Sequence, residues 1–343
     1  MSLAAVKNLG SKSKLETVVC DLCGSSDSRL KFTARNSEFN EPFNLVECHN
    51  CGLVYLNPRP TRDRIGRYYP EENYYAYQDL DSEDWNNFRQ KVKSFILECQ
   101  PGYAQNLTWL RRIVWSWFKR SLMVQVPYQK GGRILDVGCG NGFFLKWMQK
   151  HGWETHGVEI SKAACQVAQR NGLEVFNGEL QQAKFPPGYF DAITISQVLE
   201  HLHSPGRCLK ECQRILKRRG RLIVGVPNLG SFEARLYQQH WFELDVPRHL
   251  YFFTAATLNR LLSQSGFRTK RLVSKTFGIP VCCKLRSTQR AVEAMAPSGV
   301  NPLKILMLFR FIWALSAVRF SQWLSPEKRR LMGVYLTAYT ERA

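Results

Sequence analysis

The chain has 343 residues, 44% of them hydrophobic, and a formal net charge of +20. This length and composition exclude a disordered chain and predict one large α/β core with an accessory module. The charge predicts an anionic partner (a nucleic acid, an anionic membrane surface or a phosphorylated substrate), with a merely solvated basic surface as the alternative. The excess of Lys and Arg over Asp and Glu is 18 − 14 = +4 in residues 1–130, 14 − 9 = +5 in residues 131–240 and 16 − 5 = +11 in residues 241–343.

Cysteine usage points to a reducing compartment. The chain has eleven cysteines, and its N-terminus lacks the long apolar core of a signal peptide. We therefore expect a cytoplasmic protein, with membrane association as an option. The most apolar stretch, Ile305 to Val318, contains Arg310 and is too short for a membrane-spanning helix.

Two Cys-x-x-Cys turns near the N-terminus have the form of paired zinc knuckles. Each is followed directly by a glycine, which permits the turn that aims backbone N–H groups at thiolate sulfurs. Four thiolates complete a tetrahedral structural site with no open position, so we expect a structural zinc and a zinc ribbon over residues 15–60. A redox pair or plain buried cysteines is the alternative. The expected ligands are Cys20, Cys23, Cys48 and Cys51.

Residues 61–130 read as a connector rich in aromatic side chains. A tyrosine cluster (Tyr68, Tyr69, Tyr74, Tyr75 and Tyr77) is either a ring-stacking wall for a sugar or a packing seam between modules. Apolar residues at helical spacing between Glu83 and Arg120 predict two helices, which would cap the next domain.

From Arg133 the chain alternates between strand and helix patterns. Residues 133–137 predict a buried strand that ends in a glycine-rich turn, and the apolar residues from Phe143 onward predict a helix. Further strands are expected at residues 154–160, 173–176, 190–198 and 220–228, with a helix after Ser161 and another that ends at Arg219–Gly220. The turn glycines are spaced G-x-G-x-G, which differs from the G-x-G-x-x-G of dinucleotide-binding folds.

The order of these motifs resembles class I S-adenosylmethionine-dependent methyltransferases. The motifs are Leu-Asp-Val-Gly-Cys-Gly-Asn-Gly, Gly-Val-Glu-Ile-Ser, Phe-Asp-Ala-Ile, Val-Leu-Glu-His-Leu and Val-Pro-Asn, in residues 131–277. The resemblance implies a Rossmann-like α/β core of seven strands within residues 131–343, closed by an antiparallel pair at 267–277 and 333–342. The preceding ribbon is similar to that of sugar C-methyltransferases and of methyltransferases in polysaccharide and secondary-metabolite pathways. A helical insertion at residues 278–332 departs from most of the superfamily.

The resemblance also implies which residues hold the cofactor. It places Asp136 and the glycines of the turn near the methionine part of S-adenosylmethionine, Glu159 on the ribose and Glu179 near the adenine. An acid at the end of the second strand also suits ribose hydroxyls on general grounds. The expected cofactor set is Asp136, Gly138, Cys139, Gly140, Gly142, Glu159, Ile160, Glu179, Ser196 and Gln197.

Three histidines compete for the role of a general base. Methyl transfer is an in-line displacement, so a base is needed only when the acceptor must lose a proton. His249 and Tyr251 lie in a His-Leu-Tyr-Phe stretch similar to that of sugar C-methyltransferases, where a histidine and a tyrosine take part in deprotonation. His201 follows the fourth strand at the edge where ligands bind in such folds, and His240 is the third candidate. Each of them could instead satisfy a hydrogen bond in the core.

The sequence therefore predicts a methyltransferase acting on a sugar, a glycan precursor or a related metabolite. An RNA methyltransferase that uses the ribbon and the basic surface is the first alternative, although no RNA-binding signature is visible. A non-catalytic binding protein with a Rossmann-like core is the second. The insertion reads as a buried lid or dimer helix, or else as a helix on an anionic membrane surface.

Overall fold

The computed structural model describes residues 15–36, 39–69, 94–100, 102–103, 108–118, 124–275, 287 and 333–343. Apart from Ser287, the expected insertion at 278–332 lies outside the described residues, as do Tyr74, Tyr75 and Tyr77 of the tyrosine cluster. Within the described part of the chain, we find no helix with the length and apolar character that crossing a membrane requires.

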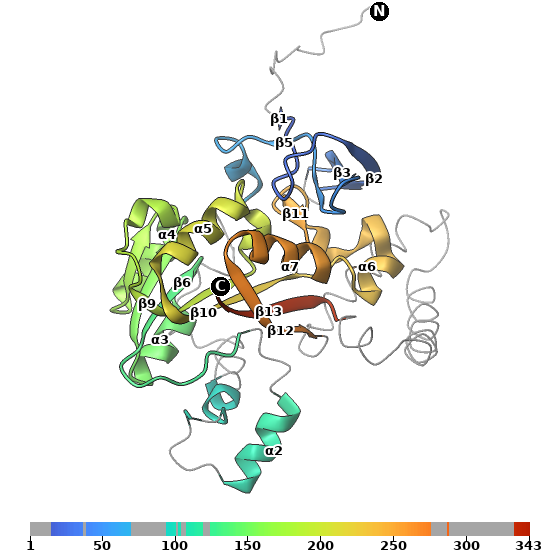
Figure 1. Cartoon of the computed structure of the whole chain (residues 1–343). Coiled ribbons are helices and arrows are strands. Elements are labelled where there is room, and N and C mark those ends of the chain that lie inside the picture. The colour runs from blue at the N-terminus through green and yellow to red at the C-terminus, as the bar shows by residue number, and fades with distance from the viewer. Residues whose placement is uncertain are drawn as a thin grey trace, which may run out of the picture.

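A seven-stranded sheet forms the centre of the molecule, in the order β12-β13-β10-β9-β6-β7-β8 (Figure 1). Strands β8, β7, β6, β9 and β10 run parallel, while β13 is antiparallel to both β10 and β12. The expected seven-stranded class I methyltransferase core, with its terminal antiparallel pair, is therefore confirmed. Its strands are β6 (Arg133–Val137), β7 (Glu154–Glu159), β8 (Glu174–Asn177), β9 (Phe190–Ser196), β10 (Leu216–Pro227), β12 (Phe267–Lys275) and β13 (Tyr335–Arg342).

Helices cover both faces of the sheet. Successive strand residues point to opposite faces, so neighbouring apolar residues pack against different helices. Leu135 packs in one buried cluster with α5 and α7, whereas its neighbour Ile134 packs in another with Trp147 and Met148 of α3. The α-helices are α2 (Trp109–Phe118), α3 (Phe143–Lys150), α4 (Lys162–Arg170), α5 (Pro205–Ile215), α6 (Phe232–Tyr237) and α7 (Ala255–Gln264). Short 3-10 helices are η1 (Ile65–Tyr68), η3 (Leu180–Ala183), η4 (Leu199–His201), η5 (Gln238–His240) and η6 (Phe242–Leu244).

One expected boundary is wrong. The helix before the fifth strand ends at Ile215 and not at Arg219–Gly220, and β10 begins at Leu216. Leu216 pairs with Phe190 of β9, and an irregularity separates this pair from the regular register that starts at Arg221. The four residues between Leu216 and Arg221 are polar or glycine, a pattern that indicates the end of a helix. In the structure they belong to β10 and bridge the irregularity.

The N-terminal residues 15–60 form a smaller unit, which we call the cysteine module. Its strands are β1 (Leu15–Glu16), β2 (Ser28–Arg35), β3 (Pro42–Cys48), β4 (Val54–Leu56) and β5 (Arg59–Pro60), and β1 pairs with β5. A four-stranded sheet has the order β11-β4-β3-β2, in which β11 (Tyr251–Phe252) comes from the second half of the chain. The module thus shares a sheet with the segment that carries His249, and Figure 1 shows it lying above the large sheet.

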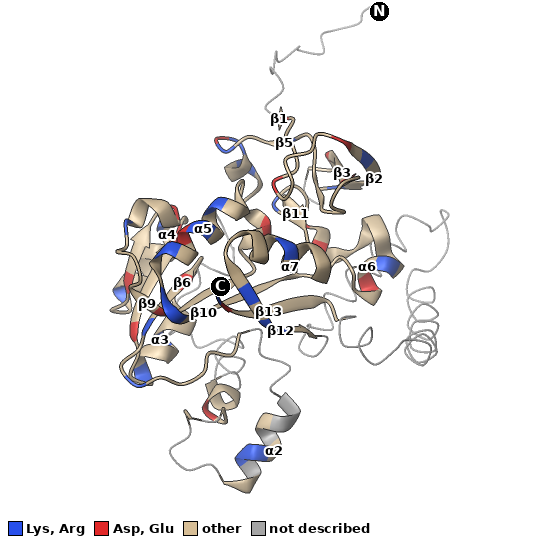
Figure 2. Cartoon of the chain, viewed as in Figure 1, with Lys and Arg blue, Asp and Glu red and all other residues tan. Residues whose placement is uncertain are grey.

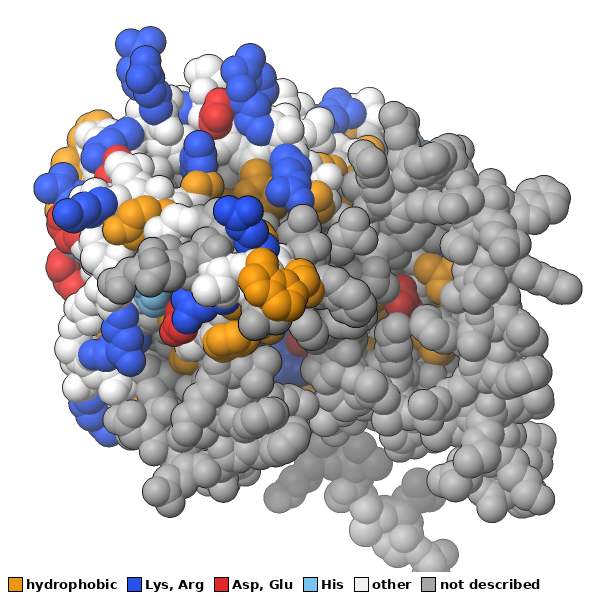
Figure 3. All heavy atoms as spheres, turned by 90° about the horizontal axis from the view of Figure 1, so that it is seen from below, with side chains coloured by type: hydrophobic (Ala, Val, Ile, Leu, Met, Phe, Trp, Pro, Cys, Tyr) orange, Lys and Arg blue, Asp and Glu red, His pale blue; other side chains and the backbone are white. Residues whose placement is uncertain are grey.

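Charged residues are spread over many elements. Figure 2 shows Lys and Arg on α2, α5, α6 and α7, with Asp and Glu interspersed. On the lower face in Figure 3, basic side chains stand among apolar and polar ones in the described part of the chain. The positive charge is thus distributed over this part of the chain and is not gathered on one helix.

Candidate active site

The glycine-rich turn after β6 has a backbone that glycine alone adopts without strain. Gly138, Gly140 and Gly142 have φ values of 72°, 55° and 83°, in the left-handed region. A Cβ atom at Gly138 would lie 2.3 Å from Val198 Cγ2, and one at Gly142 would lie 2.3 Å from Leu173 Cδ1. The turn is therefore built from glycine both for its φ angles and for close packing.

Glu159, the last residue of β7, fastens this turn to the next strand. Its Oε2 accepts a hydrogen bond of 2.8 Å from the Gly140 N–H, and its Oε1 accepts one of 2.8 Å from the Ser161 N–H. An ionised carboxylate has about four acceptor positions, so positions remain for the hydroxyls of a ribose. Ile160, next in the chain, is 75% exposed, which leaves an apolar surface beside this carboxylate.

Asp136 lies buried in β6, directly before the turn. The Thr194 hydroxyl of β9 donates a hydrogen bond of 2.5 Å to Asp136 Oδ1. Burial raises the pKa of Asp136 to about 7, and the charge of Glu159 acts in the same direction, while the bond from Thr194 opposes both. Asp136 is therefore poised to change its charge near neutral pH when a cation approaches.

Three more expected cofactor residues lie at the same edge of the sheet or next to it. Ser196 ends β9, and Gln197 follows it with φ 56° and donates its backbone N–H to Gly225 O at 2.8 Å. The Gln197 side-chain Nε2 is buried and has no hydrogen-bond partner among the described residues. Glu179 follows β8, is half-exposed and forms an ion pair with Arg62.

These features fit S-adenosylmethionine. A buried amide donor without a partner suits the carboxylate of the methionine part, and Glu159 retains free acceptor positions for hydroxyls. The turn glycines leave room for close approach of a ligand to the backbone. The remaining expected residue, Cys139, is buried with its thiol 3.9 Å from Gly140 O.

Two of the three candidate histidines lie together. The ring centroids of His201 and His249 are 4.5 Å apart, in an edge-on arrangement. We call them the histidine pair. His201 ends η4, five residues after the last residue of β9, while His249 precedes β11. His240 lies at the end of η5 and does not belong to this cluster.

Hydrogen bonds fix which nitrogen of each histidine is basic. His249 Nδ1 lies 2.8 Å from the Glu243 carbonyl oxygen, and since a carbonyl only accepts, Nδ1 is the protonated nitrogen. His201 Nδ1 lies 3.0 Å from the Arg248 carbonyl oxygen and 3.0 Å from the Tyr69 hydroxyl. Nε2 is then the nitrogen that can accept a proton in His249 and, by the same reasoning, in His201.

Burial favours the neutral form of both imidazoles. Burial, and next the proximity of His249, lowers the pKa of His201 to about 3. Burial also lowers the pKa of His249. Asp245 Oδ2 lies 4.0 Å from His249 Nε2, where a carboxylate would stabilise an imidazolium formed during reaction. A neutral imidazole can accept a proton, but a general base works best with a pKa near the operating pH. The low pKa of His201 makes it a weak base, so His249, with the Asp245 carboxylate nearby, is the stronger candidate.

Glu200 completes this cluster, and its role was missed in the sequence. One ligand-type atom from each of Glu200, His201 and His249 lies within 4.8 Å of the others. Glu200 is fully buried, and both carboxyl oxygens lack a hydrogen-bond partner among the described residues. Burial raises its pKa well above the usual range, as do the nearby Glu243 and Asp245. The cluster is a donor set that could hold a proton or a metal ion, and its signal was an acid directly before His201 at a strand end.

Tyr251 has a different environment from the histidine pair. Its hydroxyl accepts a 2.9 Å hydrogen bond from Arg59 Nη1 and donates one of 3.3 Å to the His203 carbonyl oxygen. Burial raises the pKa of Tyr251 beyond the range of an ordinary phenol. The described contacts of Tyr251 thus join it to the cysteine module.

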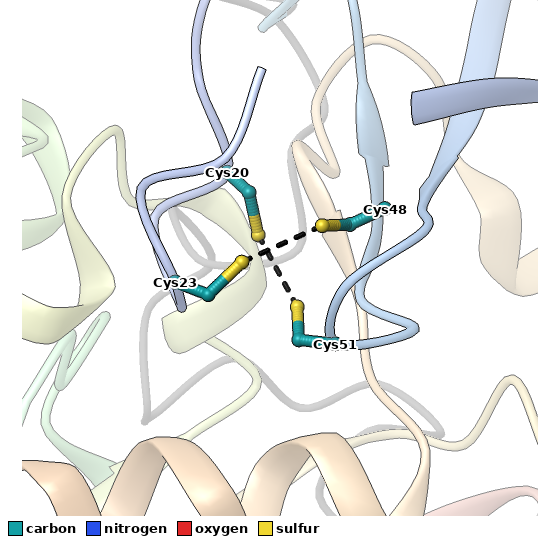
Figure 4. Close-up of side chains that lie close together, drawn as sticks. All are labelled: Cys20, Cys23, Cys48 and Cys51. Atoms are coloured by element: carbon teal, nitrogen blue, oxygen red, sulfur yellow. Dashed lines mark hydrogen bonds between the residues drawn. The ribbon is translucent and has the colours of Figure 1, made fainter. Parts of the chain in front are cut away.

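The four cysteines converge as expected of a metal site. Figure 4 shows the four side chains pointing toward one another from two knuckles. Cys20 Sγ lies 3.4 Å from Cys51 Sγ, and Cys23 Sγ lies 3.5 Å from Cys48 Sγ. A tetrahedral zinc with Zn–S bonds of 2.3 Å separates its sulfurs by roughly 3.8 Å, so small shifts would admit the ion. Gly24 and Gly52, with φ 72° and 74°, close the knuckles.

Comparison with known proteins identifies the central domain. Residues 117–272 match the family described as "Methyltransferase domain". With the strand order and the turn after β6, this match defines a class I S-adenosylmethionine-dependent methyltransferase domain.

Individual relatives match only part of this chain. An uncharacterized protein of Methanocaldococcus jannaschii is 28% identical over 146 residues, which are 43% of this chain and 69% of that protein. A ubiquinone biosynthesis O-methyltransferase of Alkalilimnicola ehrlichii is 37% identical over 108 residues, 29% of this chain and 43% of that enzyme. This chain thus spans less than half the length of the named enzyme. The solved structure of a SAM-dependent methyltransferase from Archaeoglobus fulgidus is 20% identical, with a TM-score of 0.43 over 67% of this chain and 94% of that chain.

Proposed function

We propose that the protein transfers a methyl group from S-adenosylmethionine to a sugar, a glycan precursor or a related small metabolite that loses a proton in the reaction. The observation that carries this proposal is the histidine pair: His201 follows β9, the strand beside β6 and its glycine-rich turn, and its ring contacts the ring of His249. A general base is of use only where the acceptor is a hydroxyl or an acidic carbon. The sequence resemblance of the cysteine module to the ribbon of sugar C-methyltransferases supports a sugar as the methyl acceptor.

Bound S-adenosylmethionine supplies an electrophilic methyl group on a sulfonium. The residues of the chain would position and deprotonate the acceptor. We assign His249 Nε2 as the proton acceptor, since its Nδ1–H is committed to the Glu243 carbonyl and the Asp245 carboxylate can stabilise the resulting charge. His201 packs against the His249 ring and is the second candidate for the same proton.

A second candidate function is O-methylation of a phenol. The relative from Alkalilimnicola ehrlichii, 37% identical over 108 residues, bears the name ubiquinone biosynthesis O-methyltransferase. Phenols also need a base near neutral pH, so the same histidine pair would serve. Acceptor identity, rather than the catalytic group, separates the two proposals.

The test is a transfer assay with labelled methyl donor against nucleotide sugars, lipid-linked sugars, small phenols and RNA. We expect label in a sugar or a phenol, and label in RNA alone would overturn the proposal. His249→Ala should lower turnover by about 10²- to 10⁴-fold while the affinity for S-adenosylmethionine stays nearly intact. His240→Ala, which changes a histidine outside the cluster, is the matched control. Equal turnover in both variants would remove His249 as the base, and a stoichiometric metal ion lost on changing Glu200 would reassign the cluster as ligands.

We further propose that the four cysteines hold a structural zinc, that Glu179 and Ile160 contact the adenine, and that Ser196 and Gln197 contact the methionine part. The ion pair between Arg62 and Glu179 brings the segment after the cysteine module next to this end of the site. We also propose an anionic membrane surface as a partner, because the chain has a net charge of +20. Co-sedimentation with anionic liposomes at low salt tests this proposal.

A further inference from the structure

The two segments that carry the histidine pair are hydrogen-bonded to the cysteine module. Tyr251 and Phe252 of β11 pair with Tyr55 and Val54 of β4. The Leu56 N–H donates to Leu250 O at 2.9 Å, and the Leu250 N–H donates to Glu200 O at 2.8 Å. A continuous set of backbone bonds thus runs from the strand after the second knuckle to the neighbours of His249 and then of His201.

Arg59 joins both segments at once. Its side chain is 9% exposed, and Nε donates to Glu16 Oε1 of β1 at 2.8 Å. Its Nη1 donates to the His203 carbonyl oxygen at 3.1 Å and to the Tyr251 hydroxyl at 2.9 Å. His203 is two residues from His201, and Tyr251 is two residues from His249. One guanidinium of the module therefore binds the backbone two residues after His201 and a side chain two residues after His249.

Further contacts come from the first knuckle and from the residue that follows β2. Asp21, between Cys20 and Cys23, accepts a 3.1 Å hydrogen bond from the Gly206 N–H near the start of α5. The buried Asn36 side chain donates to the Val246 carbonyl oxygen at 2.8 Å. The glycine-rich turn, in contrast, is hydrogen-bonded to Val158 and Glu159 and lies close to Leu173 and Val198, which are all outside the module.

We propose that Arg59 is a positioning residue through which the cysteine module, with its metal bound, sets the positions of His201 and His249. The module then acts on the acceptor side of the site and leaves the cofactor side unchanged. What the histidines do once positioned rests on the proposed function. Tyr251 is part of this connection: its hydroxyl receives Arg59 and holds the backbone at His203.

The test compares Arg59→Met with Arg29→Met in the full-length protein. Arg29 is an exposed arginine of β2 that pairs with Glu47, so it controls for loss of one charge from the module. The readout is the ring resonances of ¹³C-labelled histidines, which are practicable because the chain has seven histidines. His151 and His156, which lie on α3's end and on β7, serve as internal references.

We expect the resonances of both His201 and His249 to shift in Arg59→Met and in metal-stripped wild type, and to stay in place in Arg29→Met. Affinity for S-adenosylhomocysteine should change by less than about twofold in all three samples. Unmoved resonances of the pair in Arg59→Met would overturn the proposal, and so would a loss of cofactor affinity that accompanies the shift. If Arg59→Met does not fold, Tyr251→Phe removes the hydroxyl alone and must give a smaller shift of the same two residues. Because the experiment measures histidine resonances and not methyl transfer, its result can be interpreted even if the proposed activity is not found.

Discussion

At the scale of single residues, Asp136 combines full burial with a pKa near neutrality. Because burial is the main cause, a cation that approaches the carboxyl should favour its ionised form and lower that pKa. The ammonium group of the methionine part is such a cation under the proposed cofactor placement. Ligand binding and the charge of Asp136 are then linked.

The affinity for S-adenosylhomocysteine should therefore rise with pH. Below the pKa of about 7 the acid is neutral and binding has to displace its proton, so affinity should rise by at most tenfold per pH unit between pH 6 and 7 and level off above. Calorimetric titration at pH 6, 7 and 8 measures this. Asp136→Asn should bind weakly with a flat profile, and a wild-type profile as flat as that of the variant would contradict the linkage.

The histidine pair makes a separate prediction for stability. Both pKa values are lowered in the folded protein, so the unfolded chain takes up protons first, near pH 6.5. The stabilisation is complete above pH 6.5 and is lost as pH falls below it, at up to about 1.4 kcal/mol per pH unit for His201 and in the same direction for His249. Urea unfolding at pH 7 and pH 5.5 should show a smaller loss for His249→Asn than for wild type.

At the scale of elements, the strands of the large sheet could be predicted because their residues are buried and apolar, and the turn after β6 because its glycines have positive φ. The boundary between α5 and β10 could not be predicted, because it depends on the pairing of Leu216 with Phe190 of another strand. Two-residue β11 has no local pattern of its own, and its partner β4 lies in the N-terminal module.

The features of the candidate site also divide into those predicted by local sequence and those that depend on contacts between distant segments. His201 and Glu159 could be picked out from motifs that follow or end predicted strands, and His249 from the resemblance of its His-Leu-Tyr-Phe stretch to sugar C-methyltransferases. The edge-on contact of the two histidines, and the burial of Glu200 beside them, arise from segments far apart in sequence. Tyr251 was expected beside His249 as a catalytic group, and only tertiary pairing shows its hydroxyl on Arg59.

The glycine-rich turn gives a prediction at this scale. Gly138→Ala should destabilise the protein by about 1–3 kcal/mol and weaken cofactor binding, because its Cβ would meet Val198 Cγ2 at 2.3 Å. Gly172 has nearly the same φ, 73° against 72°, but a Cβ there meets no atom within 4 Å. Gly172→Ala is therefore the matched control for backbone strain alone. Equal unfolding free energies for the two variants would contradict a packing role for Gly138.

At the scale of the whole molecule, the cysteine module and the large sheet share one buried cluster. Leu45 and Leu56 of the module belong to the same cluster as Val224 of β10 and Leu258 of α7. Removal of the proposed zinc should therefore lower the stability of the complete protein and not only of the module.

Thermal unfolding followed by circular dichroism tests this coupling. Chelator-treated protein and Cys23→Ser should unfold at lower temperature, by about 2–4 °C for each kcal/mol lost. Val19→Ser, which changes an exposed apolar residue beside the first knuckle, controls for local substitution. An unchanged midpoint after complete metal removal would show that the module contributes nothing to the shared core.

The central claim is that the turn after β6, with Asp136 and Glu159, is a working S-adenosylmethionine site. Calorimetric titration of the wild-type protein with S-adenosylhomocysteine tests it most directly. We expect one site per chain, with binding weakened in Gly138→Ala and retained in His249→Ala. No heat of binding together with no shift in thermal stability would contradict it.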